Sequence, residues 1–83
     1  MAVHFTKHAR QKFQVLPNHK FTERQIIEAV EKPDLIEYSR LPLLIAQKKL
    51  NRNYVLRVVY RLEREIKIII TFYPGRTKQY EKS

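Results

Sequence analysis

Apolar side chains recur at helical spacing near the start of the chain. Three of them stand four positions apart, namely Phe5, Ala9 and Phe13. This spacing places them on one stripe, so the pattern predicts a short helix from Thr6 to about Gln14. Pro17 disfavours helical geometry at the residue before it, and the polar residues after it suit a turn. Leu16 to Lys20 is therefore predicted to connect two helices.

The second predicted helix has clear start and stop signals. Thr22 is a natural N-cap, Gln25 stands three residues later as in a capping box, and Phe21 can pack onto the helix from just outside it. Pro33 ends the helix, because the residue before a proline avoids helical geometry. We therefore expect a helix at residues 23–32. Its buried stripe is formed by Ile26, Ile27 and Val30.

Beyond Pro33 the spacing of apolar residues changes from helical to alternating, which is typical of strands. Four strands are predicted, at Asp34 to Arg40, Leu43 to Leu50, Tyr54 to Leu62 and Ile66 to Tyr73. Pro74-Gly75 is expected to end the fourth strand, and Arg76 to Tyr80 is either a tail or a brief final strand. The short polar link between the last two predicted strands requires an antiparallel hairpin. The pattern indicates a single α+β domain over residues 1–83, with two N-terminal helices on one face of a mainly antiparallel four-stranded sheet.

Strand alternation assigns side chains to the two faces of this sheet. Leu56, Val58 and Tyr60 share the face that the helices are expected to cover. On the fourth strand, strict alternation adds Ile66, Ile68, Ile70 and Phe72 to that covered face. The opposite face then carries Arg57, Arg61, Lys67, Ile69, Thr71 and Tyr73, with Lys49 nearby on the second strand.

Arg57 stands in the middle of a strand between two valines, which leaves two interpretations of its charge. A guanidinium in that position either pairs with a carboxylate or binds an anionic ligand. Glu37 is the one plausible acidic partner, because the other acids near the sheet fall at the start of the first strand, in the turn or in the tail. This shortage of acids favours a ligand. Tyr73 on the same face has a simpler interpretation as a packed side chain with a solvated hydroxyl.

The chain is strongly basic, with 17 Lys and Arg against 8 Asp and Glu and a net charge of +9. Such a charge on a small protein attracts polyanions, and nucleic acid is the first candidate. The alternatives are that the charge confers solubility or reflects the charged surfaces of heat-adapted proteins. The sequence has no cysteine, no signal-peptide pattern and no membrane span, so a soluble cytoplasmic protein is expected.

Several familiar kinds of chemistry lack the residues they need. The sequence has no paired carboxylates for general acid and base catalysis and no glycine-rich phosphate loop. His4, His8 and His19 lack the spacing of metal ligands, so neither a metal nor a cofactor is predicted. The remaining Arg, Lys, Tyr and His side chains fit phosphodiester chemistry, in which cations stabilise the phosphorane and Tyr, His or Lys moves protons.

Two parts of the sequence resemble the RelE/ParE toxin superfamily. The run Leu56-Arg57-Val58-Val59-Tyr60, the pair Gly75-Arg76 and the late Tyr80 resemble the C-terminal half of these toxins. At the front, His8-Ala9-Arg10, the helix that starts after Thr22 and the pair Pro33-Asp34 resemble a group of small RelE-like proteins. The resemblance spans most of the chain through short, degenerate motifs. It implies two helices packed on a curved antiparallel sheet.

The resemblance also implies an activity and a set of site residues. Members of this superfamily commonly cleave mRNA in the ribosome without a metal. Arg57 and Arg76 would then contact the scissile phosphate, and Tyr80 would act as the acid or base that activates the ribose 2′-hydroxyl. His8 would be a proton shuttle. The expected RNA-binding residues are Lys48, Lys49, Arg61, Tyr73 and Lys78.

Two functions therefore stay open at the level of sequence. The first is a metal-independent endoribonuclease of the toxin type, which cuts RNA by attack of its own 2′-hydroxyl and has an acidic antitoxin as its partner. The second is a non-catalytic module that binds RNA or a protein through its basic surface. ParE-type relatives keep the fold but act on gyrase, so the fold alone does not decide between the two functions.

Overall fold

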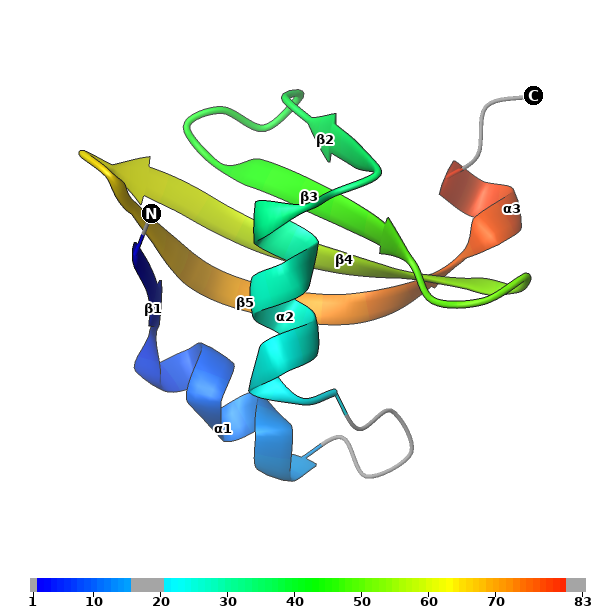
Figure 1. Ribbon diagram of the computed structural model, residues 1–83, viewed down its shortest axis with the longest axis horizontal. Coiled ribbons are helices and arrows are strands. Elements are labelled where there is room, and N and C mark those ends of the chain that lie inside the picture. Colours follow the sequence, from blue (N-terminus) through cyan, green and yellow to red (C-terminus); the bar gives the residue numbers. More distant parts are fainter. Residues whose placement is uncertain (1, 16–20, 81–83) are drawn as a thin grey trace.

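A computed structural model describes residues 2–15 and 21–80, without the side chains of residues 14, 15, 79 and 80. Its elements are β1 (Ala2–Phe5), α1 (Lys7–Val15), α2 (Glu23–Glu31), β2 (Leu35–Glu37), β3 (Leu44–Lys49), β4 (Tyr54–Glu63), β5 (Ile66–Arg76) and α3 (Thr77–Tyr80). The strands form one sheet in the order β1-β5-β4-β3-β2, which twists strongly along its length (Figure 1).

The expected four-stranded sheet is wrong, because the first residues of the chain form a fifth strand. β1 pairs in parallel with β5, with Ala2 opposite Ile66 and Phe5 opposite Ile69. The other three pairings are antiparallel, so the sheet is mixed. Phe5 has the spacing of a helical stripe but is the last residue of β1. The side chains of Phe5 and Ala9 are buried in the same core. Phe5 therefore matches the apolar stripe of the helix, although it lies outside the helix.

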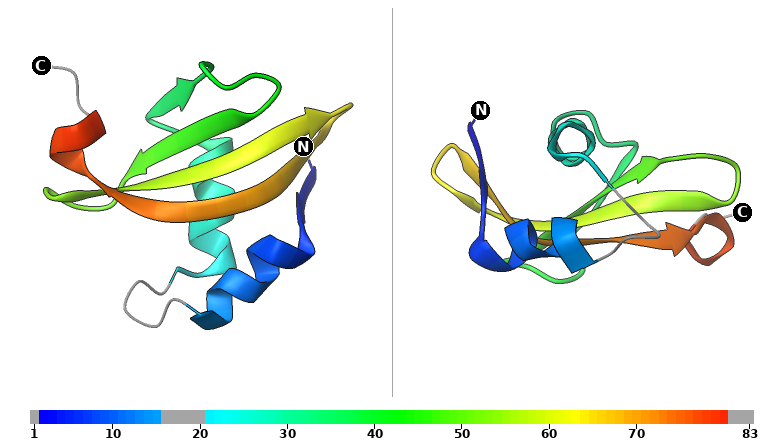
Figure 2. Two further views of the ribbon diagram at one scale, coloured as in Figure 1. Left: turned by 180° about the vertical axis from the view of Figure 1, so that it is seen from behind. Right: turned by 90° about the horizontal axis from the view of Figure 1, so that it is seen from below.

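The expected packing of both N-terminal helices on one face is also wrong. α2 contacts β3 and β4, whereas α1 contacts β1 and β5. Figure 2 shows α2 standing over one face of the sheet and α1 lying at the level of its edge. A single residue, Thr6, joins β1 to α1, so this helix stays at the edge to which β1 belongs.

Thr6 anchors the start of α1 to the neighbouring strand. Its backbone N–H donates to the carbonyl of Ile69 at 3.1 Å, and its hydroxyl donates to the carbonyl of Ile70 at 3.3 Å. The same hydroxyl accepts from the N–H of Ala9 at 3.2 Å, which satisfies one free donor of the first helical turn. The predicted helix is therefore confirmed with its bounds shifted by one residue. The predicted connection at residues 16–20 lies outside the described residues.

The predicted second helix is confirmed, including the signals at its start. The Thr22 hydroxyl accepts from the N–H of Gln25 at 3.1 Å, and the Gln25 side chain accepts from the N–H of Thr22 at 2.9 Å. These reciprocal bonds complete the capping box. Ile26 and Val30 are fully buried, and Ile27 is partly buried.

Several strand ends differ from the prediction. β2 is only three residues long, and β5 continues through Pro74 and Gly75 to Arg76. Proline is tolerated at this point because β1 pairs only with the first part of β5, which leaves the rest of β5 as an edge without a neighbour that needs its N–H. The segment after Arg76 is a short helix, α3, rather than a tail or strand.

A β-bulge changes the faces of β5. The pairing with β4 shifts by one residue beside Tyr60, which leaves Ile70 without an opposite partner. One extra residue reverses the alternation, so the faces expected for the start of β5 are wrong. Ile69 and Lys67 lie on the covered face with Tyr60. The Lys67 ammonium donates to a carbonyl of α2 and lies 5.8 Å from the Tyr60 ring centroid.

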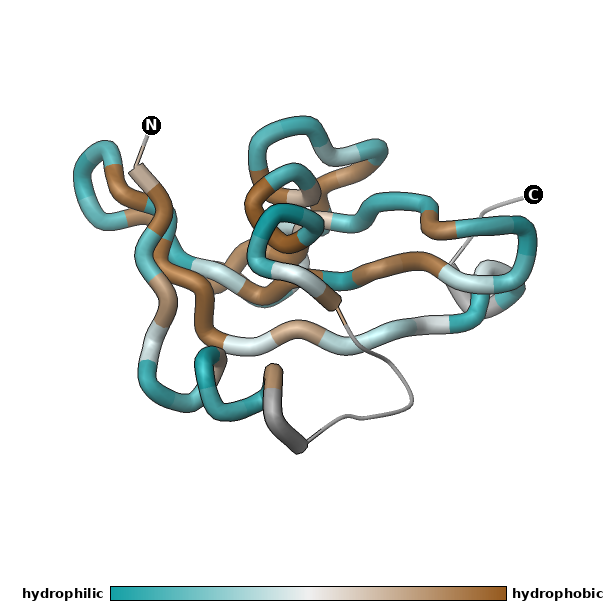
Figure 3. Tube along the Cα trace, turned by 60° about the horizontal axis from the view of Figure 1, so that its bottom comes forward, coloured by the Kyte–Doolittle hydropathy of each residue, from teal (hydrophilic) through white to brown (hydrophobic). Residues whose placement is uncertain are grey.

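One hydrophobic core joins the sheet to α1 and α2. Its largest fully buried side chains are Phe72, Ile26, Leu56, Ile69, Val30 and Val58. Phe13 and Phe21 pack their rings against Phe72, with centroid distances of 5.0 and 6.1 Å. Tyr60, which alternation placed on the covered face, is 2% exposed, so this prediction is confirmed. Figure 3 shows that the turns at the sheet ends are mainly hydrophilic, in contrast to the apolar middle of the strands.

Candidate nucleic-acid interface

The β3–β4 turn and α3 lie at the same end of the sheet (Figure 1). Two depressions lie there, with volumes of about 540 and 790 Å³. The first, called the Tyr54 depression, is lined by Arg52, Asn53, Tyr54, Arg76, Thr77 and Lys78. The second, called the Val55 depression, is lined by Asp34, Gln47, Lys48, Lys49, Leu50, Asn51, Arg52 and Val55. We refer to the five cationic residues of these walls, namely Lys48, Lys49, Arg52, Arg76 and Lys78, as the basic end.

The two depressions share Arg52 and meet at the β3–β4 turn, with Tyr54 and Arg76 of the first on the covered face and Lys49 and Val55 of the second on the opposite face. Among the described residues that line them, Asp34 is the only acid. Its carboxylate oxygen Oδ2 accepts from the backbone N–H of Lys49 at 2.7 Å, and its own N–H donates to the carbonyl of Gln47 at 2.8 Å. Asp34 therefore serves to hold the chain after α2 against β3. The walls of both depressions carry a large excess of positive charge.

Backbone hydrogen bonds fix the turn that carries Arg52. The Asn51 side-chain oxygen accepts from the N–H groups of Asn53 and Tyr54, both at 2.9 Å. The carbonyl of Tyr54 accepts from the N–H of Leu50 at 3.0 Å and that of Asn51 at 3.2 Å. Asparagine is favoured in such a turn because its short side chain can bond the backbone two residues ahead. Arg52 is thus presented on an ordered turn.

α3 is tied to the same turn. The N–H of Thr77 donates to the carbonyl of Asn53 at 2.8 Å. This bond holds the residues on either side of Thr77, Arg76 and Lys78, next to the turn that bears Arg52. Thr77 itself is 5% exposed, and its hydroxyl has no hydrogen-bond partner among the described residues. The three cations of the Tyr54 depression therefore come from two segments, which the Thr77–Asn53 hydrogen bond and the pairing of Tyr54 with Arg76 hold together.

Lys48 and Lys49 point to opposite sides of β3. The ammonium of Lys48 donates to the carbonyl of Lys32 at 2.8 Å, at the C-terminal end of α2. A cation is favourable there because it neutralises the negative end of the helix dipole. Lys48 is therefore committed to the fold, while the exposed Lys49 lines the Val55 depression from the opposite face of the sheet.

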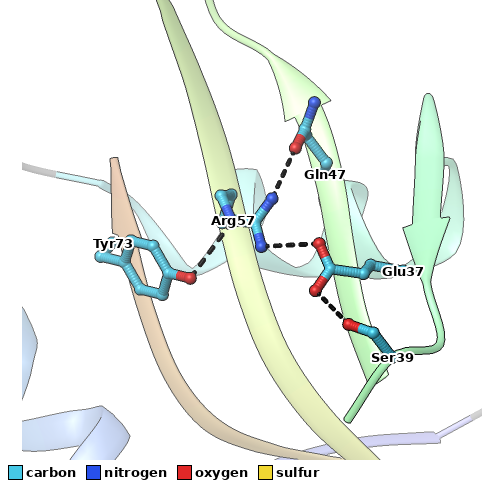
Figure 4. Close-up of polar contacts among 5 residues, drawn as sticks. All are labelled: Glu37, Ser39, Gln47, Arg57 and Tyr73. Carbon is cyan, nitrogen blue, oxygen red and sulfur yellow. Dashed lines mark hydrogen bonds and ion pairs between the residues drawn. The ribbon is translucent and has the colours of Figure 1, made fainter. Parts of the chain in front are cut away.

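Arg57 is paired with Glu37 and lies within a polar network in the middle of the sheet (Figure 4). Its Nη2 lies 3.0 Å from Oε1 of Glu37, and its Nη1 donates to Oε1 of Gln47 at 2.8 Å. Its Nε donates to the Tyr73 hydroxyl at 3.1 Å. Ser39 donates to the second carboxylate oxygen of Glu37 at 2.7 Å. Of the two interpretations of Arg57, the carboxylate partner is the one present in the structure.

Burial and hydrogen bonding shape the electrostatics of this network. The Arg57 side chain is 5% exposed, against 34% for that of Glu37. The Ser39 hydroxyl and then the Arg57 guanidinium hold the pKa of Glu37 below its usual value. Burial alone would lower the pKa of Arg57, but the hydrogen bonds from its guanidinium to Tyr73 and Glu37 outweigh burial and raise that pKa. Both groups are therefore charged at neutral pH.

The two arginines that the resemblance assigns to one phosphate do not lie together. Arg57 pairs with Tyr73, whereas Arg76 is three residues further along β5 and pairs with Tyr54. Three residues of strand span about 10 Å. An odd separation also places the two arginines on opposite faces, with Arg76 on the side of Phe72. Arg76 belongs to the basic end and Arg57 does not.

The other expected site residues are distributed over the molecule. Tyr73 contacts Arg57, with its ring centroid 5.8 Å from the guanidinium carbon. Arg61 lies further along β4 with Nη2 3.6 Å from Glu63. His8 is exposed on α1, away from α3 in Figure 1. The backbone of Tyr80 ends α3, but its side chain lies outside the described residues.

Sequence reasoning missed two residues that line the Tyr54 depression, namely Arg52 and Tyr54 itself. The signal that could have found Arg52 is the run Asn51-Arg52-Asn53 between two strands, which is typical of a turn that presents its central side chain. Tyr54 is the first residue of β4 and lies at the end of the sheet, where alternation along the strand gives no sign of a binding surface.

Comparisons with protein-family models, curated proteins and solved structures find no match to this chain. The resemblance to RelE/ParE toxins therefore stays a prediction. No group of three or more His, Cys, Asp or Glu side chains that could hold a metal ion occurs within residues 2–15 and 21–80, as far as their side chains are described. In the described part of the chain, no helix has both the length and the apolar character needed to cross a membrane.

Proposed function

We propose that this protein binds RNA through its basic end. The observation that carries the proposal is the pair of adjoining depressions that share Arg52 and whose described walls contain five cations and one acid. The one acid, Asp34, offsets a single positive charge, so the walls keep a clear excess of cations. A phosphodiester backbone supplies the repeated negative charges that such a surface attracts. The proposal implies a cytoplasmic protein that meets RNA there.

The structure sets the size of the expected salt effect. The Tyr54 depression brings three cations together, namely Arg52, Arg76 and Lys78. For a single strand, three contacts predict a slope of about −2.1 in a plot of log affinity against log salt. Between 50 and 200 mM salt, the affinity would then fall by about 20-fold.

The test is fluorescence anisotropy with a labelled 20-nucleotide RNA over this salt range, without divalent metal. The double variant Arg52→Ala/Arg76→Ala removes two contacts and should make the slope shallower by about 1.4. The matched control is Lys7→Ala/Arg24→Ala, which removes the same charge from exposed positions on α1 and α2. Equal slopes for the two double variants would show that only net charge matters and would overturn the assignment to the basic end. Tighter binding of DNA of the same sequence would overturn the assignment to RNA.

A metal-independent endoribonuclease is the second candidate function. It is supported by the position of α3, which puts residue 80 within about one helical turn of Arg76. In this function the ligand is mRNA, on the ribosome or free, and an acidic antitoxin segment competes for the same cations. The test is incubation with RNA or translating ribosomes, followed by a search for 2′,3′-cyclic phosphate ends. Cleavage by the wild type that Tyr80→Phe and Arg76→Ala both retain would refute the proposed roles of those residues.

A further inference from the structure

Tyr54 is a tyrosine in a depression whose other walls include three cations. It is half-buried and lines the Tyr54 depression together with Arg52, Arg76 and Lys78. Tyr60, by comparison, is buried in the core, and Tyr73 is engaged with Arg57. A partly exposed ring beside several cations offers both a stacking surface and counter-charges for phosphate.

The ring of Tyr54 also rests on a rigid base. Its backbone N–H and carbonyl take part in three hydrogen bonds with Asn51 and Leu50. It stands opposite Arg76 in the β4–β5 ladder, and the Thr77–Asn53 bond closes the same corner. A rigid aromatic platform loses little conformational entropy when a base stacks on it. The backbone that carries the ring is therefore held in place by hydrogen bonds.

The shared wall at Arg52 suggests how consecutive nucleotides are arranged. The Tyr54 depression lies on one side of Arg52, and the Val55 depression, with Lys49 and Gln47, lies on the other. A guanidinium between two adjoining depressions is placed to contact the phosphate that joins two nucleotides. The volumes of the depressions, about 540 and 790 Å³, fall within the range of small-ligand sites.

We infer that the basic end holds two consecutive unpaired nucleotides, with one base stacked on Tyr54 and the joining phosphate on Arg52. This inference rests on the proposed RNA-binding function and specifies its ligand. Bases in a duplex are stacked on their neighbours and paired across the helix, so a ring on the protein can reach only a base that is unpaired. The protein should therefore prefer single-stranded RNA to duplex RNA.

Tyr54→Leu tests the stacking position. This variant should bind single-stranded RNA about 10-fold more weakly than the wild type, whereas Tyr54→Phe, which keeps the ring, should bind within about 2-fold. The matched control is Tyr38→Leu, which removes a tyrosine that is 60% exposed after β2 and should leave binding unchanged. A 2-aminopurine base in the RNA gives a second readout, because stacking on Tyr54 should quench its fluorescence. Thermal unfolding of each variant reports whether the fold is intact.

The outcomes separate this inference from the proposed function. If Tyr54→Leu keeps both full affinity and full quenching while Arg52→Ala/Arg76→Ala weakens binding, the stacking position is wrong and RNA binding stands. Duplex RNA that binds the wild type as tightly as single-stranded RNA would overturn the inference in the same way. If no RNA binds with a salt dependence, the proposed function itself is refuted.

Discussion

Removing the Glu37 carboxylate should destabilise the protein, because it leaves the charge of Arg57 buried with one partner fewer. The Arg57 side chain is 5% exposed, and its ion pair with Glu37 spans 3.0 Å. Breaking a buried ion pair by removing one member costs about 3–5 kcal/mol. The cost in Glu37→Gln is smaller, since Glu37 is one-third exposed and Arg57 keeps its hydrogen bonds to Gln47 and Tyr73. We expect a loss of about 2 kcal/mol at pH 7.

Such a loss is large for a protein of this length. A domain of 83 residues has a free energy of unfolding of roughly 4–12 kcal/mol. A change of about 2 kcal/mol should lower the midpoint of thermal unfolding by roughly 10 °C. The measurement is urea denaturation followed by circular dichroism, with thermal unfolding as a second readout.

The pH dependence of this loss has a defined sign. Hydrogen bonds from Ser39 and then Arg57 lower the pKa of Glu37 from its usual 4.5. The pair therefore contributes fully above that value, and its contribution is lost as the pH falls through the lower pKa of the folded state. The difference between wild type and Glu37→Gln should accordingly shrink as the pH falls from 7 toward 3.

Glu63→Gln is the matched control for this experiment. Glu63 also faces an arginine, but its pair with Arg61 spans 3.6 Å and the two side chains are 57% and 43% exposed. Exposed pairs of this kind contribute about 0–1 kcal/mol. If Glu37→Gln lowers the free energy of unfolding no more than Glu63→Gln does at pH 7, the buried Arg57 does not depend on the Glu37 carboxylate. The argument from burial then fails.

Two further changes test the packing around the sheet. Thr77→Val replaces a buried hydroxyl without a described partner by a methyl group of similar size. The variant should raise the free energy of unfolding, measured by urea denaturation, by about 1 kcal/mol. A lower free energy of unfolding would show that the hydroxyl has a partner. Lys12 donates to Thr71 and to the carbonyl of Phe72, and burial lowers its pKa from 10.5. Between the lowered pKa and 10.5, the unfolded chain therefore binds more protons than the folded protein. The wild type should gain stability relative to Lys12→Met as the pH rises through this range. A difference in free energy of unfolding that does not change with pH would contradict the prediction.

Local signals along the chain predicted the elements that depend on local chemistry. The capping box from Thr22 to Gln25 needs only residues within one helical turn, so the start of α2 follows directly from the sequence. Arg57 and Tyr73 were also correctly placed on one face, because β4 and the end of β5 alternate regularly. Where the strands pair regularly, the alternation of residues along the sequence is sufficient to predict which side chains share a face.

The features that were missed depend on distant segments. β1 is four residues long, and only its pairing with β5 makes it a strand. The bulge at Ile70 lies within a run of three isoleucines, in which an extra residue leaves no trace in the pattern. Glu37 was named as the possible partner of Arg57, but the balance of acids favoured a ligand, and their pairing depends on β2. Likewise, Arg52 comes near Arg76 through the pairing of Tyr54 with Arg76 and the bond from Thr77 to Asn53. Contacts between segments far apart in the sequence determine each of these features.

The parallel pairing of β1 with β5 has a consequence for how the protein forms during synthesis. Ala2 pairs with Ile66, which is translated 64 residues later. Contacts between such distant segments slow folding, since a long loop must close before they are made. Until β5 leaves the ribosome, β1 has no strand to pair with and α1 has no edge to rest on. The basic end also depends on the last residues of β5 and on α3, so the surface proposed to bind RNA is completed only after α3 has been translated.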